Sequence, residues 1–223
     1  MLVPDFFLEE HFSVYEDVIR KYSAGPKKVQ KGTILHDAQA ENKTSYYILD
    51  GIAALKIINE SGLEQILFYL CKGSLYPINT IKTPLSMDGY LHVIAVTDLT
   101  VLTFPAGLLS KMIEESHGFA EAAIEHYVKY TNVLLCKILL HSYNDSTKCV
   151  CSFLYLHHVY YVTNNIINLT QEQIGQLLGL SRVQVARVFS ILREENIIET
   201  KRNNIIVLNP ERLKIKCSDI VID

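Results

Sequence analysis

The stretch that decides the fold lies at residues 169–208 and reads LTQEQIGQLLGLSRVQVARVFSILREENIIETKRNNIIVL. Two short runs with the apolar spacing of helices are separated by Gly179, and a hairpin pattern follows them. This order of helix, tight turn, helix and hairpin is typical of a winged helix-turn-helix. Because that fold places its second helix in the major groove, the stretch predicts a protein that binds DNA.

Both helices of this stretch are predicted to begin at a hydroxyl residue. Thr170 is followed three residues later by Gln173, and Ser181 by Gln184. In such a capping box the hydroxyl accepts a backbone N–H, while the Gln side chain accepts the N–H of the capping residue. Gly179 can adopt the left-handed conformation that ends a helix. We therefore expect two capped helices joined by a turn at Gly179.

Apolar residues recur at steps of three and four in both helices, so each helix is expected to bury one face. These residues are Ile174, Leu177 and Leu178 in the first helix and Val185, Val188, Phe189 and Leu192 in the second. Gly175 lies inside the first helix, where Gly costs about 1 kcal/mol relative to Ala, so we expect a neighbouring helix to cross closely there. The side chains left on the other face of the second helix are Arg182, Val183, Ala186, Arg187 and Ser190.

The pattern resembles the DNA-binding domain of the Crp/Fnr family of bacterial transcription regulators. The family's capped helix, Ile-Gly pair, Gly turn, Ser-Arg pair and later Arg match Thr170, Ile174, Gly175, Gly179, Ser181, Arg182 and Arg187. A wing follows, with a turn at residues 201–204. The resemblance implies that DNA is contacted by Thr170, Ser181, Arg182, Val183, Gln184, Arg187, Lys201 and Arg202.

The resemblance gives individual side chains a role beside a plainer alternative. Arg182 and Arg187 are expected to bond guanine with their forked guanidinium groups, the alternative being that both are solvated. Val183 stands where the family often has a Glu that accepts from cytosine, so the operator should differ from that of the cyclic-AMP receptor protein. Val183 itself can contact a thymine methyl group.

The other predicted contacts also have two readings. Gln184 either caps Ser181 or reaches a phosphate or an adenine. Thr170 and Ser181 either bind phosphate at helix N-termini or act only as caps. The wing residues Lys201 and Arg202 either contact phosphates or are solvated.

Charge is distributed unevenly along the chain. Residues 170–216 contain eight basic and five acidic residues, a net charge of +3, so the rest of the chain, whose total is −3, carries −6. A basic DNA-reading domain attached to an acidic body fits this asymmetry, and phosphate attraction should be moderate and salt-sensitive.

Other features of the 223 residues bear on location. No apolar run reaches the roughly 18 residues of a membrane span, and the N-terminal residues lack the pattern of a secretory signal. The five cysteines are an odd number without the spacing of a disulfide framework. We expect a cytoplasmic protein with free thiols and no membrane contact.

Residues 28–104 read as strands punctuated by Gly turns, which predicts a sandwich or barrel. The order K-G-T, Y-Y-I-L-x-G, S-G-x-E and K-G resembles the β-roll of cyclic-nucleotide-binding-like domains, the sensor domain of the same family. We therefore expect an α+β fold with an N-terminal β-roll, a long dimerisation helix and a C-terminal winged helix-turn-helix. The expected domains are residues 1–118, 119–143 and 144–223, and residues 2–22 should form one or two short helices.

The pattern turns helical over residues 119–141, with a seam of residues at steps of three and four. A seam sustained for about six turns resembles a coiled-coil interface. The alternative is a helix packed on its own sheet, but a two-fold operator requires a two-fold protein, so we favour a homodimer. The predicted interface residues are Ile124, Tyr127, Thr131, Leu134, Ile138 and His141.

The sensor half departs from members of the family that bind cyclic AMP. Their phosphate cassette has a Gly-Glu pair and an Arg-Ser pair, whereas residues 73–92 have neither and contain Lys82 as the lone cation. We expect no cyclic nucleotide to bind. The run at residues 74–77, Ser-Leu-Tyr-Pro, resembles the branch that senses halogenated phenols. A pocket for a small aromatic acid is predicted from Leu75, Tyr76, Ile78, Lys82, Tyr127 and Tyr130, although these tyrosines can also be core residues.

Two further classes of protein were weighed. An enzyme is not expected, because the strand region has no H-x-H pair and the chain has no nucleophile–base motif or phosphate loop. We expect no catalytic residue, metal site or cofactor. A DNA-binding or assembly protein with a vestigial roll, indifferent to effectors, is the remaining alternative. The expected partners are double-stranded DNA, a second copy of the chain, a small-molecule effector and RNA polymerase.

Overall fold

The computed structural model describes residues 7–8, 11–37, 44–58, 64–78, 90–143, 145–161, 165–201 and 204–218. The chain divides between Thr131 and Asn132 into two compact units, here called the N-terminal and the C-terminal unit. Each unit is described by itself. The domain boundaries expected from the sequence, after residues 118 and 143, stay a prediction.

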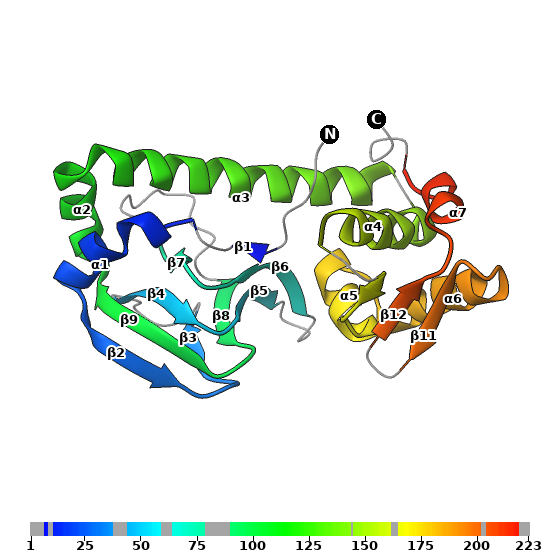
Figure 1. Ribbon diagram of the computed structural model, residues 1–223, viewed down its shortest axis with the longest axis horizontal. Helices are drawn as coiled ribbons and strands as arrows, with labels where there is room; N and C mark the ends of the chain where they lie inside the picture. Colours follow the sequence, from blue (N-terminus) through cyan, green and yellow to red (C-terminus); the bar gives the residue numbers. More distant parts are fainter. Residues whose placement is uncertain are drawn as a thin grey trace. The chain divides into compact units, whose positions relative to one another are not determined.

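The described strands of the N-terminal unit form two sheets (Figure 1). The first has the order β1-β6-β5-β8-β3 and consists of Phe7–Leu8, Glu64–Leu70, Ala53–Ile58, Leu91–Ala95 and Ile34–His36. The second has the order β2-β9-β4-β7 and consists of Ala24–Val29, Leu99–Pro105, Thr44–Asp50 and Leu75–Tyr76. All neighbours pair antiparallel except β1 and β6, so the predicted β-roll is confirmed.

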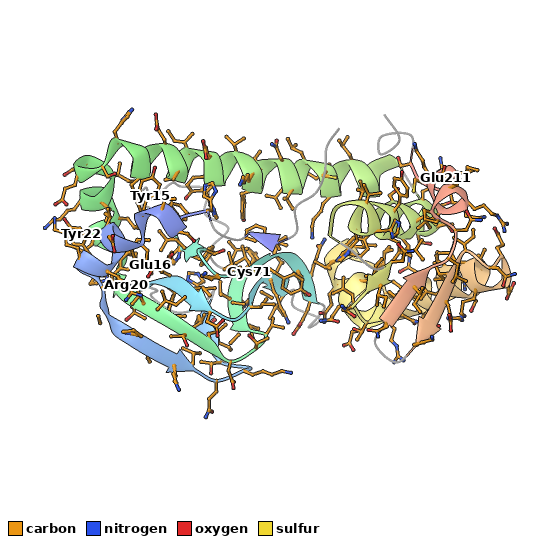
Figure 2. The ribbon with its side chains drawn as sticks, viewed as in Figure 1. Tyr15, Glu16, Arg20, Tyr22, Cys71 and Glu211 are labelled. Carbon is orange, nitrogen blue, oxygen red and sulfur yellow. The ribbon has the colours of Figure 1, made fainter. Side chains whose placement is uncertain are left out.

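Short helices cover one side of this roll. They are η1 (Ser13–Tyr15), α1 (Glu16–Tyr22), η3 (Ala106–Leu108) and α2 (Leu109–Glu115). Tyr15, labelled in Figure 2, packs edge-on against Phe119, with ring centroids 5.9 Å apart. The prediction of helices over residues 2–22 is wrong at Phe7–Leu8, which pairs with Tyr69–Leu70 as a parallel strand.

Helix α3 (His117–Tyr143) begins two residues earlier than the predicted 119. In the N-terminal unit, Phe119, Ala122, Ala123 and His126 lie buried on one face, whereas Ile124, Tyr127 and Val128 are exposed. Further along the helix, Thr131, Leu135 and Ile138 are exposed and Leu134 is half-buried. The side chain of His141 lies outside the described residues. Helix α3 therefore packs on its own roll and still carries an exposed apolar stripe.

The C-terminal unit contains helices packed against a small sheet. Its elements are α4 (Ser146–Tyr161), β10 (Ile166–Ile167), α5 (Gln171–Leu178), α6 (Arg182–Glu194), β11 (Ile198–Lys201), β12 (Asn204–Val207) and α7 (Pro210–Ile215). The sheet order is β10-β12-β11, so the predicted wing hairpin is confirmed and gains a third strand. None of the helices in the described part of the chain is long and apolar enough to cross a bilayer.

Candidate nucleic-acid interface and ligand cavity

Helix α5 begins with the predicted capping box. The Gln173 backbone N–H donates to Thr170 Oγ1 at 3.1 Å, and the Thr170 N–H donates to Gln173 Oε1 at 2.9 Å. Ile174, Leu177 and Leu178 are buried, as their spacing predicts. The cap fixes where α5 starts, and the buried face fixes how the helix is rotated.

The turn between α5 and α6 is tight because of two glycines. Gly179 has φ 64°, the left-handed conformation that ends a helix. At Gly175, a Cβ would lie 2.7 Å from the carbonyl oxygen of Leu180 and 3.7 Å from Val185 Cγ2. The close neighbour is thus backbone of the turn, and only then α6. The expectation that a crossing helix excludes a side chain at Gly175 was wrong. The backbone carbonyl of Leu180 excludes it instead.

Helix α6 begins with a second capping box. The Gln184 N–H donates to Ser181 Oγ at 3.3 Å, and Gln184 Oε1 accepts from the Ser181 N–H at 2.9 Å and from its hydroxyl at 2.8 Å. The capping reading of Gln184 is therefore confirmed. Its phosphate or adenine contact stays a prediction.

The two faces of α6 differ as the sequence predicts. Val185, Val188, Phe189 and Leu192 are buried. Arg182, Val183 and Arg187 are exposed, and Val183 is 70% exposed, a large fraction for an apolar side chain. Ala186 and Ser190 are half-buried.

The arginines of this unit fall into two groups. Within the described residues, Arg182 and Arg187 make no hydrogen bond or ion pair. By contrast, Arg193 donates to Ser190 Oγ at 3.0 Å, and Arg212 donates to the Glu195 carbonyl oxygen at 2.7 Å. The guanidinium groups on the exposed face of α6 are therefore available to an outside acceptor.

A groove of about 370 Å³ lies beside α6. Its lining residues are Leu169, Thr170, Gln171, Glu172, Arg182, Phe189, Thr200, Lys201, Asn204 and Ile205. It brings together three predicted DNA contacts, Thr170, Arg182 and Lys201, which come from the start of α5, the start of α6 and the wing. Ser181, Val183, Gln184 and Arg187 are exposed but do not line it, and Arg202 lies outside the described residues.

The sequence analysis missed several residues of this unit. Gln171, Thr200 and Asn204 line the groove, and the acidic Glu172 does too. Lys137 on α3 is buried and donates to the carbonyl oxygen of Leu177, in the last turn of α5, at 2.7 Å. Burial lowers the pKa of Lys137 to about 7. A donor at a helix C-terminus satisfies carbonyls that lack helical partners, so Lys137 fastens α5 to α3.

The N-terminal unit holds a separate cavity of about 180 Å³ between its roll and α3. Its lining residues are Tyr76, Pro77, Ile78, Leu91, His126, Tyr127 and Tyr130. Four of the six predicted effector contacts, Tyr76, Ile78, Tyr127 and Tyr130, are among them. Leu75 is instead fully buried in the core, because the alternation along β7 turns it away, and Lys82 lies outside the described residues.

His126 is the lining residue that the sequence analysis did not single out. It is 4% exposed, and its Nδ1 is shielded from water without a hydrogen-bond partner in the described part of the chain. Burial, followed by the nearby His11 and Lys129, lowers the pKa of His126 to about 4, so the imidazole is uncharged at neutral pH. In the sequence, His126 precedes Tyr127 and lies four residues before Tyr130, and this helical spacing could have identified it as a lining residue.

Other chemistry finds no support in the described residues. No group of His, Cys, Asp or Glu among them could hold a metal ion. None of the cysteines forms a disulfide bond and all are buried, namely Cys71, Cys136, Cys149, Cys151 and Cys217. Burial raises the pKa of Cys149 to about 11 and that of Cys151 to about 12, so both thiols stay protonated and poorly reactive.

Three comparisons with known proteins agree with this geometry. The model of the Crp-like helix-turn-helix domain matches residues 150–215. The chain is 23% identical over 177 residues to the global nitrogen regulator of Synechococcus elongatus, an alignment that covers 75% of this chain and 78% of that protein. It is 21% identical over 187 residues to the cAMP-activated global transcriptional regulator CRP of Salmonella typhimurium, covering 81% and 88%. A solved structure of CprK complexed with OCPA matches with a TM-score of 0.73 at 19% identity, covering 95% and 100%.

A β-roll, a long helix and a winged helix-turn-helix with an exposed basic face define a DNA-binding regulator with a cyclic-nucleotide-binding-like N-terminal domain. Residues 150–215 match the Crp-like helix-turn-helix domain, and the chain is similar to DNA-binding transcription regulators of the Crp/Fnr type. Both relatives are named as regulators, which agrees with the expectation that the chain is not an enzyme.

Proposed function

We propose that this regulator reads an operator with the exposed face of α6, acts as a two-fold dimer through α3, and responds to a small molecule in the N-terminal unit. The observation that carries the proposal is the state of Arg182 and Arg187. Both are exposed without a partner in the described residues, on a helix whose opposite face is fully buried. A rigid helix that presents unpaired guanidinium groups suits guanine recognition.

Phosphate contacts are proposed beside this face. The groove joins the N-terminus of α5, Arg182 and the wing residue Lys201, and exposed helix N–H groups and cations favour anions. Lys201 Nζ also lies 3.5 Å from Glu199 Oε1. Because this ion pair is exposed, it is weak, and the ammonium group can exchange partners. Ser181, Gln184 and Arg202 complete the proposed contact set.

The proposed dimer interface is the apolar stripe of α3. Ile124, Val128, Thr131, Leu135 and Ile138 are exposed and follow steps of four and three, the spacing of a coiled-coil seam. Tyr127 is 46% exposed and also lines the cavity. A ligand that moves Tyr127 would therefore act directly at the interface and so on the spacing of the two α6 helices.

The proposed effector is a small aromatic molecule and not a cyclic nucleotide. The described lining of the cavity contains four aromatic or imidazole rings and no cation that could pair with a cyclic phosphate. Among proteins of this fold, the solved CprK structure contains OCPA. RNA polymerase stays an expected partner for activation or repression.

One selection experiment tests the proposal. Random DNA is selected on the purified protein with and without a panel of small phenols and carboxylic acids, and the bound sites are sequenced. We expect a palindrome whose half-sites lie about 34 Å apart, with enrichment that depends on a panel member. A palindrome selected identically in every sample would instead favour an effector-independent DNA-binding protein. Failure to select any palindrome would overturn the two-fold model.

A further inference from the structure

We infer that the cavity beside α3 takes an uncharged, single-ring ligand whose one polar group engages the imidazole of His126. The inference rests on the proposal that the N-terminal unit binds an effector, and it specifies the class of that effector. It separates a neutral ring compound from the carboxylate of an aromatic acid. Size, charge and hydrogen-bonding capacity each support it.

The volume of the cavity suits a ligand with one ring. The cavity measures about 180 Å³, whereas drug-sized ligands occupy roughly 300–1,000 Å³. A cavity of about 150 Å³ in another protein accommodates benzene. A six-membered ring with one small substituent therefore fits within this volume.

The described lining of the cavity favours an uncharged ligand over an anion. Tyr76, Tyr127, Tyr130 and the apolar lining residues are uncharged at neutral pH, and His126 is kept uncharged by burial. Lys129, whose Nζ lies 3.4 Å from His11 Nδ1, does not line the cavity. Among the described lining residues, a carboxylate would find no charged partner to offset the water that it loses.

Hydrogen-bonding capacity identifies His126 as the polar contact. The lining tyrosines Tyr76, Tyr127 and Tyr130 all have interactions elsewhere in the protein. His126 packs against the rings of His11, Phe12 and Tyr127 and has no hydrogen bond in the described residues. A neutral imidazole both donates and accepts, and because Nδ1 is shielded from solvent, Nε2 is the ring nitrogen for a ligand hydroxyl.

Calorimetric titration of the full-length protein at pH 7 tests the inference with four probes. Phenol supplies a neutral ring with a hydroxyl, toluene lacks the hydroxyl, benzoate adds the charge, and 1-naphthol adds a second ring. We expect phenol to bind about tenfold more tightly than each of the other three, the effect of one hydrogen bond. Benzoate that binds as tightly as phenol, or no heat with any probe, would overturn the inference.

Substitution assigns the contact. His126→Leu should make phenol and toluene bind equally, whereas His117→Leu, at a 91%-exposed histidine of the same helix, should preserve the tenfold preference. A preference that survives His126→Leu would overturn the role of His126. If that variant does not fold, the imidazole NMR signals of His126 in the unmutated protein decide, since they must shift on saturation with phenol. Operator binding without ligand is measured in parallel, so failure here is distinguishable from failure of the proposed DNA-binding function.

Discussion

The two candidate sites of this molecule treat charge in opposite ways. On α6, Arg182 and Arg187 stand exposed without internal partners, while the cavity of the N-terminal unit has an uncharged described lining and a histidine kept neutral by burial. Long-range attraction to a polyanion needs exposed charge, and selection of one small ring needs dry, shaped surface. We therefore expect the chain to attract DNA by Coulomb forces and to select the proposed effector by desolvation.

The largest expected effect comes from removing a buried side chain that supports the exposed face of α6. Phe189→Ala removes a fully buried ring beneath α6 and should cost about 3–5 kcal/mol of unfolding free energy. Hydrogen exchange should show lost protection in α6 and unchanged protection in β4. The control Ile191→Ala, on the exposed side of the same helix, should cost less than about 1 kcal/mol. Equal losses of protection in α6 and β4 would show that the units do not unfold separately.

The pH dependence of stability tests whether His126 is kept neutral by burial. Because the pKa of His126 is lowered from 6.5 to about 4, the unfolded chain binds more protons between these values. The free energy of unfolding is therefore highest above pH 6.5. It falls by about 3 kcal/mol as the pH falls from 6.5 toward 4. Urea unfolding at several pH values checks this, and His126→Gln should flatten the dependence. A variant with the unchanged slope of the parent would refute the assignment, and His117→Gln is the matched control.

Arg187→Ala tests whether an exposed arginine of α6 recognises a base. It should weaken operator binding by about 1–3 kcal/mol and lose discrimination at one base pair, with stability unchanged. Fluorescence anisotropy on operators altered one position at a time measures both. Arg193→Ala is the control, since Arg193 is held by Ser190 within the protein. Equal weakening on every sequence would mean that Arg187 contacts phosphate only.

The smallest expected effect is at Val183. Val183→Ala removes methyl groups that are 70% exposed in the free protein, so stability should be unchanged. Operator affinity should fall by less than about 1 kcal/mol, and only on sites with a thymine at the contacted position. The same anisotropy series detects it. A fall at every position would exclude a methyl contact.

How far the sequence predicts each site depends on the range of the interactions. The capping boxes at Thr170 and Ser181 join residues three apart, so the pattern alone predicts them. Gly175 was recognised as special, but its neighbour Leu180 becomes known only when the turn closes.

Residues placed by distant contacts were missed. The β1 strand depends on β6, which follows it by more than fifty residues, and two residues carry no period to detect. Lys137 meets the carbonyl of Leu177 forty residues on, and His126 becomes a cavity residue only once α3 packs on the roll. The local pattern thus predicted α6 almost residue by residue and the cavity only by its general place.

The hydrogen bonds between Gln184 and Ser181 restrict which bases of an operator Gln184 can recognise. Recognition of adenine by Gln uses both halves of the amide, the carbonyl accepting from N6 and the NH₂ donating to N7. In Gln184 the carbonyl half already holds the first turn of α6. An adenine opposite Gln184 could be read in full only by releasing the start of the helix, whereas a lone acceptor such as a phosphate oxygen could be bound at no such cost. Base preference at that position and the fraying of α6 are therefore one equilibrium, and a mutation that loosens the helix start should also change which base is tolerated there.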